Sequence, residues 1–437
     1  MRTETHRVRR VSRAHKEARL GGADLAGQDS STGLRRAARW GSNLRHSHDR
    51  CLCNLADRQI TSSSSTKDFL KGRRMSHIEG LKTQLQGKRR KPVVYSGIDN
   101  CFDVEPLPCG IAAIDYILGG GLAYGRLSEL FGNYSTGKSY LLYLFLAMNQ
   151  RLGGTSVLFE SEGAYSKDFF RSIGGSPEDL LVRPANATED IFDGMADISK
   201  YASKQKDDHR FCVGWDSIAG TGTKHLQKTG MEKRDMSKAG SMTQGCQYIT
   251  ALIAEQRICV IATNQTRDTI GEDYDPMKRT HTPGGRAWPF HASQRLELQY
   301  RGGFITQTDE KGEPDHTKPS LGQRVRAFVD KNRLCPPHQT CELTFYNHAG
   351  YPHPLYGTPT KLGVDYAESL YHFYRHSEFR LPNGNPVIQL SGSWNKIDES
   401  VAEYKKFYAK DWLKVLEDIP DLWQLAYTKP ADTSEDK

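Results

Sequence analysis

The sequence predicts an α/β protein with a mostly parallel, twisted sheet, and three observations support that prediction. A phosphate-binding loop pattern lies between an apolar strand pattern and an apolar helix pattern, within residues 129–142. After it, short apolar runs that end in polar residues alternate with helical patterns. Such alternation places helices on both faces of a parallel sheet. A change of pattern after about Asp365 predicts a second, small domain.

Residues 1–74 are predicted to be a disordered basic segment. They hold 17 Lys and Arg against 7 Asp and Glu, whereas the whole chain of 437 residues has a net charge of +8. Few of them are apolar, so they cannot bury enough surface to fold alone. Three interpretations are open for this segment. It is a basic arm that contacts nucleic acid, a transit peptide, or translated sequence upstream of a natural start at Met75. The acidic residues Glu4 and Glu17 argue against a transit peptide. We favour the last interpretation.

Composition also limits the compartment and the partners. No apolar run reaches the roughly 18 residues that a membrane helix needs, so we expect no membrane partner. The nine cysteines are scattered and follow no secretory signal, which predicts free thiols and a cytoplasmic protein. A zinc site at Cys335, His338 and Cys341 lacks a fourth ligand, and we do not favour it. Because residues 75–437 carry slightly more acids than bases, nucleic acid would be bound by local basic loops.

The first elements after Met75 are short. Ser76 to Gln86 is predicted to be a helix, with Ser76 as its N-cap and Glu79 three residues further on. An extended segment follows, and Pro106 to Leu118 is an apolar helical stretch that Gly119–Gly121 ends. Residues 75–108 therefore form a small N-terminal helix and strand element.

The phosphate-binding loop spans Gly132 to Ser139 and reads GNYSTGKS. Gly132 and Gly137 allow a tight turn whose backbone N–H groups point at a polyphosphate. Lys138 supplies positive charge to the β- and γ-phosphates, and the Ser139 hydroxyl suits a Mg²⁺ ion. Since the next residues form an apolar helix, the phosphates would lie at a helix N-terminus. The pattern predicts ATP and Mg²⁺ as ligands.

Further strands and helices follow in turn. The predicted strands share short apolar runs: 155–160, 210–215, 257–263, 295–300, 324–331 and 341–346. The predicted helices share apolar residues at helical spacing: 167–173, 187–202 and 241–255. Two polar stretches, 222–238 and 267–285, are predicted to be loops, and the insertion 303–319 is polar and without a predicted role.

Polar residues at the ends of the predicted strands are the candidate catalytic and metal-binding residues. Asp216 ends an apolar strand, where an acid would hold Mg²⁺ beside the phosphate loop. Glu160 and Glu162 both lie at the end of the preceding strand, and either carboxylate could activate the attacking water. Gln265 follows the third strand, where its amide could contact the γ-phosphate and report it to the following loop.

These motifs, taken in order, resemble the RecA-type recombinases of bacteria and phages from about Met75 to about Pro430. GRLSELFGNYSTGKS at 125–139, Glu162-Gly-Ala, Trp215-Asp216-Ser217 and Asn264-Gln265 followed by Pro283-Gly-Gly carry the resemblance. It implies a RecA-like P-loop NTPase core over residues 109–360, with DNA-binding loops at about 222–240 and 266–285. It also implies an N-terminal polymerisation element at 75–108 and a small α/β C-terminal domain at 361–437.

The resemblance assigns roles to particular residues. It selects Glu162 as the catalytic base and places Phe169 against adenine. Lys331 and Arg333 match a cation pair that reaches the nucleotide of a neighbouring subunit, although the family usually has two lysines there. With Lys138 and Gln265 these complete the catalytic set. The residues expected to hold the nucleotide and its metal are Gly132, Asn133, Tyr134, Ser135, Thr136, Gly137, Lys138, Ser139, Tyr140, Phe169 and Asp216, of which Ser139 and Asp216 ligate Mg²⁺.

The implied function is an ATP-dependent recombinase that forms filaments on single-stranded DNA and pairs it with double-stranded DNA. The expected DNA contacts lie in or beside the two loops: Lys228, Lys233, Arg234, Lys238, Arg267, Ile270, Tyr274, Lys278, Arg279, Gly284 and Gly285. A ring helicase built on the same ATPase core is the first alternative, and a regulatory module that binds ATP without hydrolysis is the second. The protein would act on the nucleoid, or in the host cytoplasm if it is viral.

Overall fold

The computed structural model describes residues 78–87, 104–205, 207–230, 237–268, 280–308, 313–315, 317–377, 379–404 and 406–427. The chain divides into two units, residues 1–96 and 97–437. The prediction for residues 1–74 lies outside the described residues. In the first unit, residues 78–86 form the predicted helix, in which the Thr83 hydroxyl donates to the Glu79 carbonyl at 2.9 Å.

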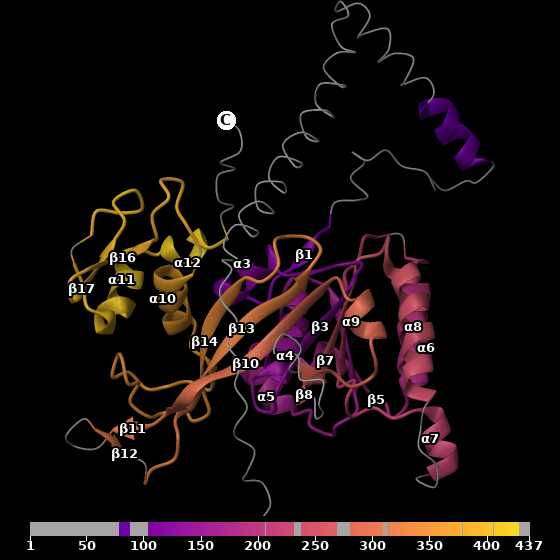
Figure 1. Cartoon of the computed structure of the whole chain (residues 1–437), viewed down its shortest axis with the longest axis horizontal. Coiled ribbons are helices and arrows are strands. Elements are labelled where there is room, and N and C mark those ends of the chain that lie inside the picture. Colours follow the sequence, from indigo (N-terminus) through magenta and orange to yellow (C-terminus); the bar gives the residue numbers. More distant parts are fainter. Residues whose placement is uncertain are drawn as a thin grey trace, which may run out of the picture. The chain divides into compact units, whose positions relative to one another are not determined.

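One large sheet dominates the second unit (Figure 1). Within the described part of the chain it contains nine strands. Their order across the sheet is β15 (Gly363–Val364), β14 (Thr340–Tyr346), β13 (Gly322–Asn332), β10 (Gln294–Ile305), β3 (Leu127–Gly132), β7 (Ile258–Gln265), β6 (Phe211–Asp216), β4 (Thr155–Glu160) and β5 (Leu180–Pro184).

The sheet has a parallel part and an antiparallel edge. From β10 to β5 every neighbouring pair is parallel, whereas β13, β14 and β15 join antiparallel beside β10. The predicted mostly parallel sheet is confirmed. In a parallel sheet the carboxyl ends of the strands lie along one edge, so β3, β4, β6 and β7 bring their ends together there.

Helices cover both faces of the sheet because its central strands are apolar on both sides. In β7, Cys259 and Ile261 belong to one core, while Val260 and Ala262 belong to the other. The first core is covered by α3 (Ala112–Leu118), α4 (Lys138–Arg151), α5 (Lys167–Ser172) and α10 (Tyr366–His376). The second is covered by α6 (Thr188–Ala202), α8 (Ser237–Ile253) and α9 (Ala287–His291).

A long hairpin extends from the sheet. Strands β10 and β13 continue past the sheet, and the short pair β11 (Gln307–Thr308) and β12 (Pro314–Asp315) lies at the tip (Figure 1). The described residues of the polar insertion, 303–308, 313–315 and 317–319, therefore lie at the end of an antiparallel ribbon. Two further short pairs are β1 (Pro106–Leu107) with β2 (Leu122–Ala123), and β8 (Arg267–Asp268) with β9 (Thr280–His281).

The residues after Asp365 form short helices and one hairpin. Helix α10 precedes the hairpin of β16 (Ile388–Ser391) and β17 (Trp394–Ile397), and the chain continues through η4 (Ala409–Asp411), α11 (Trp412–Asp418) and α12 (Leu422–Leu425). Its aromatic residues are mainly core, since Tyr371, Phe373 and Trp412 are at most 2% exposed. These side chains join the core cluster beneath β13 and β14, so the region packs directly on the sheet.

Several local predictions are wrong. Residues 224–229 form α7 (Lys224–Thr229) inside a stretch predicted to be a loop, because Thr223 caps the helix and Lys224 pairs with Asp190 at 2.8 Å. Strand β5, helix α9 and the turn η2 (Pro177–Asp179) were not predicted, because each is short and has no clear periodicity. None of the helices in the described part of the chain is long and apolar enough to span a membrane.

Candidate nucleotide-binding site

The phosphate loop leads from β3 into α4, as predicted. Its glycines are required by close approach as well as by backbone angle. Gly132 has a φ of 147°, and a side chain there would lie 2.1 Å from the carbonyl oxygen of Leu298 on β10. Gly137 has a φ of 89° and faces the Phe345 ring, which a Cβ atom would approach to 2.6 Å. Any larger residue at either position would push the loop off the sheet.

A cavity of about 500 Å³ opens beside this loop. It is large enough for a nucleotide. The predicted residues that line it come from the loop and from the ends of the neighbouring strands: Tyr134, Ser135, Gly137, Lys138, Ser139, Tyr140, Glu162, Phe169, Asp216 and Gln265. The tertiary structure therefore brings together residues spread over more than 130 positions of the chain.

The Lys138 ammonium group lies inside the loop. Its Nζ atom donates to the Asn133 carbonyl oxygen at 2.5 Å, and the Thr136 hydroxyl donates to the same oxygen at 2.9 Å. Burial lowers the pKa of Lys138, while the carboxylates of Asp216 and Glu162 oppose that shift. A triphosphate in the cavity would add negative charge and favour the charged amine further.

Asp216 is almost fully buried at the end of β6, at 3% exposure. The Thr263 hydroxyl donates to its Oδ1 atom at 2.5 Å, and Ser139 also hydrogen-bonds to this carboxylate. Burial raises the pKa of Asp216, and these two hydroxyl groups lower it. The hydroxyl and carboxylate oxygens are hard donors at one point of the cavity, which fits the ligand preference of Mg²⁺.

The two candidate acids at the end of β4 lie in different environments. Glu160 is 8% exposed, and its carboxylate accepts backbone N–H groups from Glu162, Gly163 and Ala164 at 2.9–3.0 Å. Glu162 is exposed, lines the cavity and accepts a short hydrogen bond from the Ser217 hydroxyl. Glu160 therefore holds the loop in shape, and Glu162 is the carboxylate that can reach a water molecule in the cavity.

Gln265 lies at the junction of the phosphate loop and the second polar loop. The Thr266 N–H donates to the Gly132 carbonyl at 3.2 Å, and the Thr266 hydroxyl donates to Asn133 Oδ1 at 2.5 Å. Asn264 accepts the Gln265 N–H at 3.0 Å and donates to the Pro283 carbonyl at 3.1 Å. The two ends of the second loop are thus tied to the nucleotide side of the sheet.

The aromatic residues at the cavity pack on one another. Tyr140 lies 6.0 Å from the Phe169 ring and 5.5 Å from the Phe345 ring, centroid to centroid. Tyr140 is 8% exposed, and its hydroxyl accepts the Val364 N–H at 3.2 Å. Phe169 is half-buried on α5, with part of its ring facing the cavity.

Strands β13 and β14 and the segment after them also form part of the cavity, which the sequence patterns did not predict. Gln323 lies on β13, and its amide donates a hydrogen bond to the Ser135 carbonyl oxygen in the phosphate loop. Phe345, Tyr346 and Asn347 complete that wall of the cavity. They lie about 200 residues after the loop, and no local pattern marks them, because β13 and β14 join the sheet by antiparallel pairing far along the chain from the motif.

Lys331 and Arg333 do not line the cavity. Lys331 Nζ donates to the carbonyl oxygens of Pro289 and Phe290 at 2.9 and 2.8 Å, and Arg333 donates to Phe290 at 3.1 Å. Both cations therefore donate hydrogen bonds to carbonyl oxygens near the C-terminal end of α9. Burial, together with the charges of Arg333 and Arg295, lowers the pKa of Lys331 to about 8.

The expected DNA contacts are described in part. Lys228 on α7 and Arg267 on β8 are exposed, and Gly284 and Gly285 form the turn that ends the second loop. Lys238 donates to backbone carbonyls of Ile218 and Thr221 at 2.7 and 2.6 Å, so a DNA phosphate would compete with contacts inside the chain. The other predicted contacts lie outside the described residues: Lys233, Arg234, Ile270, Tyr274, Lys278 and Arg279.

The zinc interpretation that we did not favour finds no support in the structure. Cys341 lies in the apolar core at 5% exposure, and within the described residues its thiol forms no cluster with Cys335 and His338. The described cysteines are free thiols, as expected.

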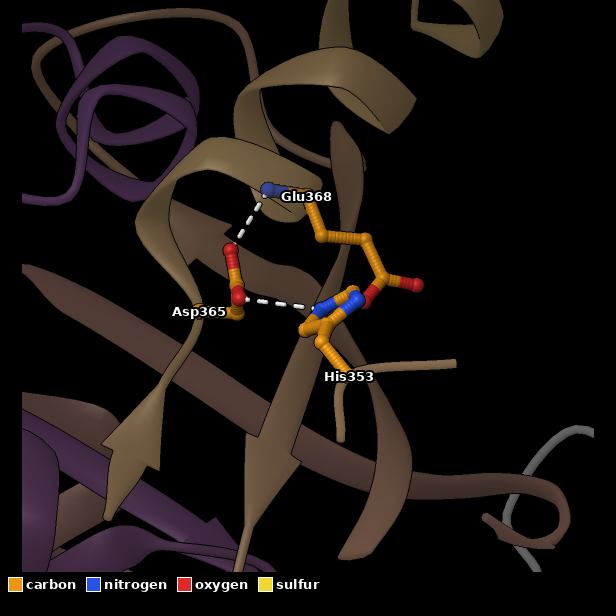
Figure 2. Close-up of side chains that lie close together, drawn as sticks. All are labelled: His353, Asp365 and Glu368. Carbon is orange, nitrogen blue, oxygen red and sulfur yellow. Dashed lines mark hydrogen bonds and ion pairs between the residues drawn. The ribbon is translucent and has the colours of Figure 1, made fainter. Parts of the chain in front are cut away.

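A different trio of possible metal ligands, His353, Asp365 and Glu368, does converge (Figure 2). There, however, His353 Nδ1 accepts backbone N–H groups of Leu355 and Tyr356 at 3.0 and 3.2 Å. Its Nε2 therefore carries the proton and donates to the carboxylates, so this cluster is structural.

The fold and the cavity define a nucleotide-binding protein of the phosphate-loop class, with a parallel sheet and an added antiparallel edge. Residues 82–351 match the sequence model of the RecA N-terminal domain. The chain belongs to the RecA family.

The curated relatives agree with this assignment. Protein RecA of Thermus thermophilus is 28% identical over 289 residues, which span 64% of this chain and 78% of that protein. Protein RecA of Symbiobacterium thermophilum is 27% identical over 314 residues, or 71% and 79% of the two chains. Protein RecA of Rhodopirellula baltica is 26% identical over 348 residues, or 78% and 82%.

Proposed function

We propose that this protein is an ATP-dependent DNA recombinase. It polymerises on single-stranded DNA with ATP between subunits, pairs the bound strand with homologous double-stranded DNA, and exchanges strands in recombination and repair, in the cytoplasm. Membership of the RecA family supports this assignment. The observation that carries the proposal is that both ends of the second loop are held beside the cavity: Thr266 hydrogen-bonds to Asn133 in the phosphate loop, and Pro283 accepts a hydrogen bond from Asn264, next to the cavity residue Gln265.

Hydrolysis would use residues of one cavity. Lys138 binds the β- and γ-phosphates, and Glu162 accepts a proton from the water that attacks the γ-phosphate. Ser139 and Asp216 would hold Mg²⁺, which neutralises charge on the phosphate oxygens when bound. Gln265 donates its amide to the γ-phosphate, and Phe169 packs beside the base.

The second loop would respond to that contact. Gln265 lies next to Thr266, which bonds to Asn133 in the phosphate loop, so a shift of the γ-phosphate moves the start of the DNA loop directly. ATP would hold the loops ordered for DNA, and hydrolysis would release them. Lys228 and Arg267 would contact DNA phosphates.

The cation pair would act across the subunit interface. Lys331 and Arg333 lie outside their own cavity and would reach the γ-phosphate held by the next subunit. A cation supplied by a neighbour stabilises the negative charge that develops in the transition state. This raises the rate of hydrolysis by about 10³–10⁵. Hydrolysis then depends on assembly, and assembly depends on DNA.

A complementation experiment tests this function. Phosphate release is measured with and without single-stranded DNA for wild type, for Lys138→Ala, and for the double variant Lys331→Ala with Arg333→Ala. Wild type should be stimulated by DNA, and each variant alone should not. Mixing the two variants should restore part of the activity, because an intact phosphate loop then meets an intact cation pair.

Two outcomes would contradict the proposal. If the double variant alone keeps full DNA-stimulated turnover, the pair is only a surface feature and the filament mechanism fails. If electron micrographs show closed rings and no filament in the presence of DNA, a ring motor replaces the recombinase. Hydrolysis by wild type excludes the regulatory module that only holds ATP.

A further inference from the structure

A chain of paired charges, buried at Glu129 and partly exposed at Asp330, connects the nucleotide side of the sheet with the outward cation pair. Glu129 on β3 is fully buried, at 0% exposure, and accepts hydrogen bonds from Arg295 Nε at 2.6 Å and from Asn264 Nδ2 at 2.9 Å. Arg295 on β10 also donates to Asp330 on β13. A buried carboxylate is stable only when it is paired in this way.

Each end of this chain touches a functional element. At one end, Asn264 precedes Gln265 and bonds to Pro283, where the second DNA loop ends. At the other end, Asp330 immediately precedes Lys331. The Arg295 guanidinium lies between the carboxylates of Glu129 and Asp330. It is 4.3 Å from the centre of the Phe131 ring, which restricts its orientation.

Strand register explains why Asp330 matters. Arg295 is opposite Lys331, but the next residue on β10, Leu296, is opposite Val329. Asp330 is therefore the extra residue of a β-bulge, and a bulge redirects the side chains beside it. Val329 faces the core, and after the bulge Lys331 extends to the carbonyls of α9. The ion pair with Arg295 holds the bulged residue.

We propose that the Arg295–Asp330 ion pair is a positioning element that fixes the β-bulge and thereby aims Lys331 and Arg333 at the neighbouring subunit's nucleotide. Through Glu129 and Asn264 the same chain makes the direction of the cations depend on the end of the second DNA loop. This inference rests on the proposed function. Asp330 acts through Lys331 and does not itself touch the nucleotide.

The test uses Asp330→Asn, which keeps the shape of the side chain and removes its charge. The Asp330 side chain is 35% exposed, so the change is tolerable for folding. DNA-stimulated hydrolysis should fall at least tenfold, with an unchanged affinity for ATP in the absence of DNA. The matched control is Glu342→Gln, because Glu342 is also a partly exposed acid paired with an arginine, Arg301, at 3.5 Å on this sheet. The control should retain wild-type stimulation.

Mixing experiments separate positioning from a general structural defect. Asp330→Asn mixed with Lys138→Ala should regain activity, because Lys138→Ala subunits contribute well-aimed cations to the intact cavity of Asp330→Asn. Asp330→Asn mixed with the Lys331→Ala, Arg333→Ala double variant should regain none, since both partners lack the same function. If Asp330→Asn folds poorly, Asp330→Ser is used and should give the same asymmetry.

The outcomes distinguish this inference from the proposed function. Stimulation of Asp330→Asn within twofold of wild type overturns the inference and leaves the recombinase proposal standing. Loss of activity that Lys138→Ala does not restore also overturns it, since the defect then lies in the variant's own cavity. Absence of DNA stimulation in wild type overturns both.

Discussion

The two acids at the end of β4 allow a quantitative prediction. The same change, glutamate to glutamine, should reduce turnover at Glu162 and stability at Glu160. Glu162→Gln removes a carboxylate that is exposed and that accepts a hydrogen bond from Ser217. Its free energy of unfolding should change by no more than about 0.5 kcal/mol. Turnover should fall by about 10²–10⁴, the contribution of a positioned general base. ATP binding should persist, so the variant should remain in a DNA-bound filament.

Glu160→Gln should instead affect folding. The Glu160 Oε1 atom accepts two backbone N–H groups and Oε2 accepts one, from Gly163 at 2.9 Å. A glutamine amide offers one acceptor oxygen, and its NH₂ group would oppose the remaining N–H group. Losing a charged hydrogen bond while leaving a buried donor unpaired costs about 1.5–3 kcal/mol. The unfolding midpoint should therefore drop by several degrees.

The assay measures three quantities for both variants: phosphate release with single-stranded DNA, binding of a fluorescent ATP analogue, and thermal unfolding. At a temperature where both are folded, Glu160→Gln should retain much more turnover than Glu162→Gln. The assignment is refuted if Glu162→Gln hydrolyses ATP at the wild-type rate. It is also refuted if Glu160→Gln abolishes hydrolysis with an unchanged unfolding midpoint.

Three further changes test the phosphate loop, the N-terminal segment and Lys331. Lys138→Ala should abolish hydrolysis while leaving the unfolding midpoint nearly unchanged, and ordinary turnover by the folded variant would disprove the role of the phosphate loop. Deleting residues 1–74 should leave strand exchange nearly unchanged, whereas a large loss of DNA affinity at moderate salt would identify a basic arm. The pKa of Lys331 is about 8 in the free subunit, and a phosphate of the neighbouring subunit would raise it. Above pH 8, assembly should therefore take up a proton. The affinity between subunits should then fall by up to about tenfold for each pH unit. Sedimentation at pH 7, 8 and 9 measures this, and Lys331→Arg should remove the dependence, since arginine stays charged.

The sequence by itself determined the local chemistry of the nucleotide site. Gly132 and Gly137 are recognisable because only glycine tolerates those backbone angles and close approaches. Asp216 and Gln265 are recognisable because each ends an apolar strand, and strand ends meet at one edge of a parallel sheet. Periodicity also located most of the long strands and helices, because burial on one or both faces leaves a repeat in the residue order.

Only the tertiary structure decided the relations between distant elements. Residues alone left Glu160 and Glu162 as equal candidates, and only hydrogen bonding and exposure show that they occupy different environments. The wall of the cavity formed by Gln323 and Phe345 depends on antiparallel strands that join the sheet far along the chain.

The chain from Glu129 through Arg295 to Asp330 depends on the same pairing and on one bulge. Its pairs join residues more than 30 positions apart in the chain, so no short stretch of the sequence reveals them.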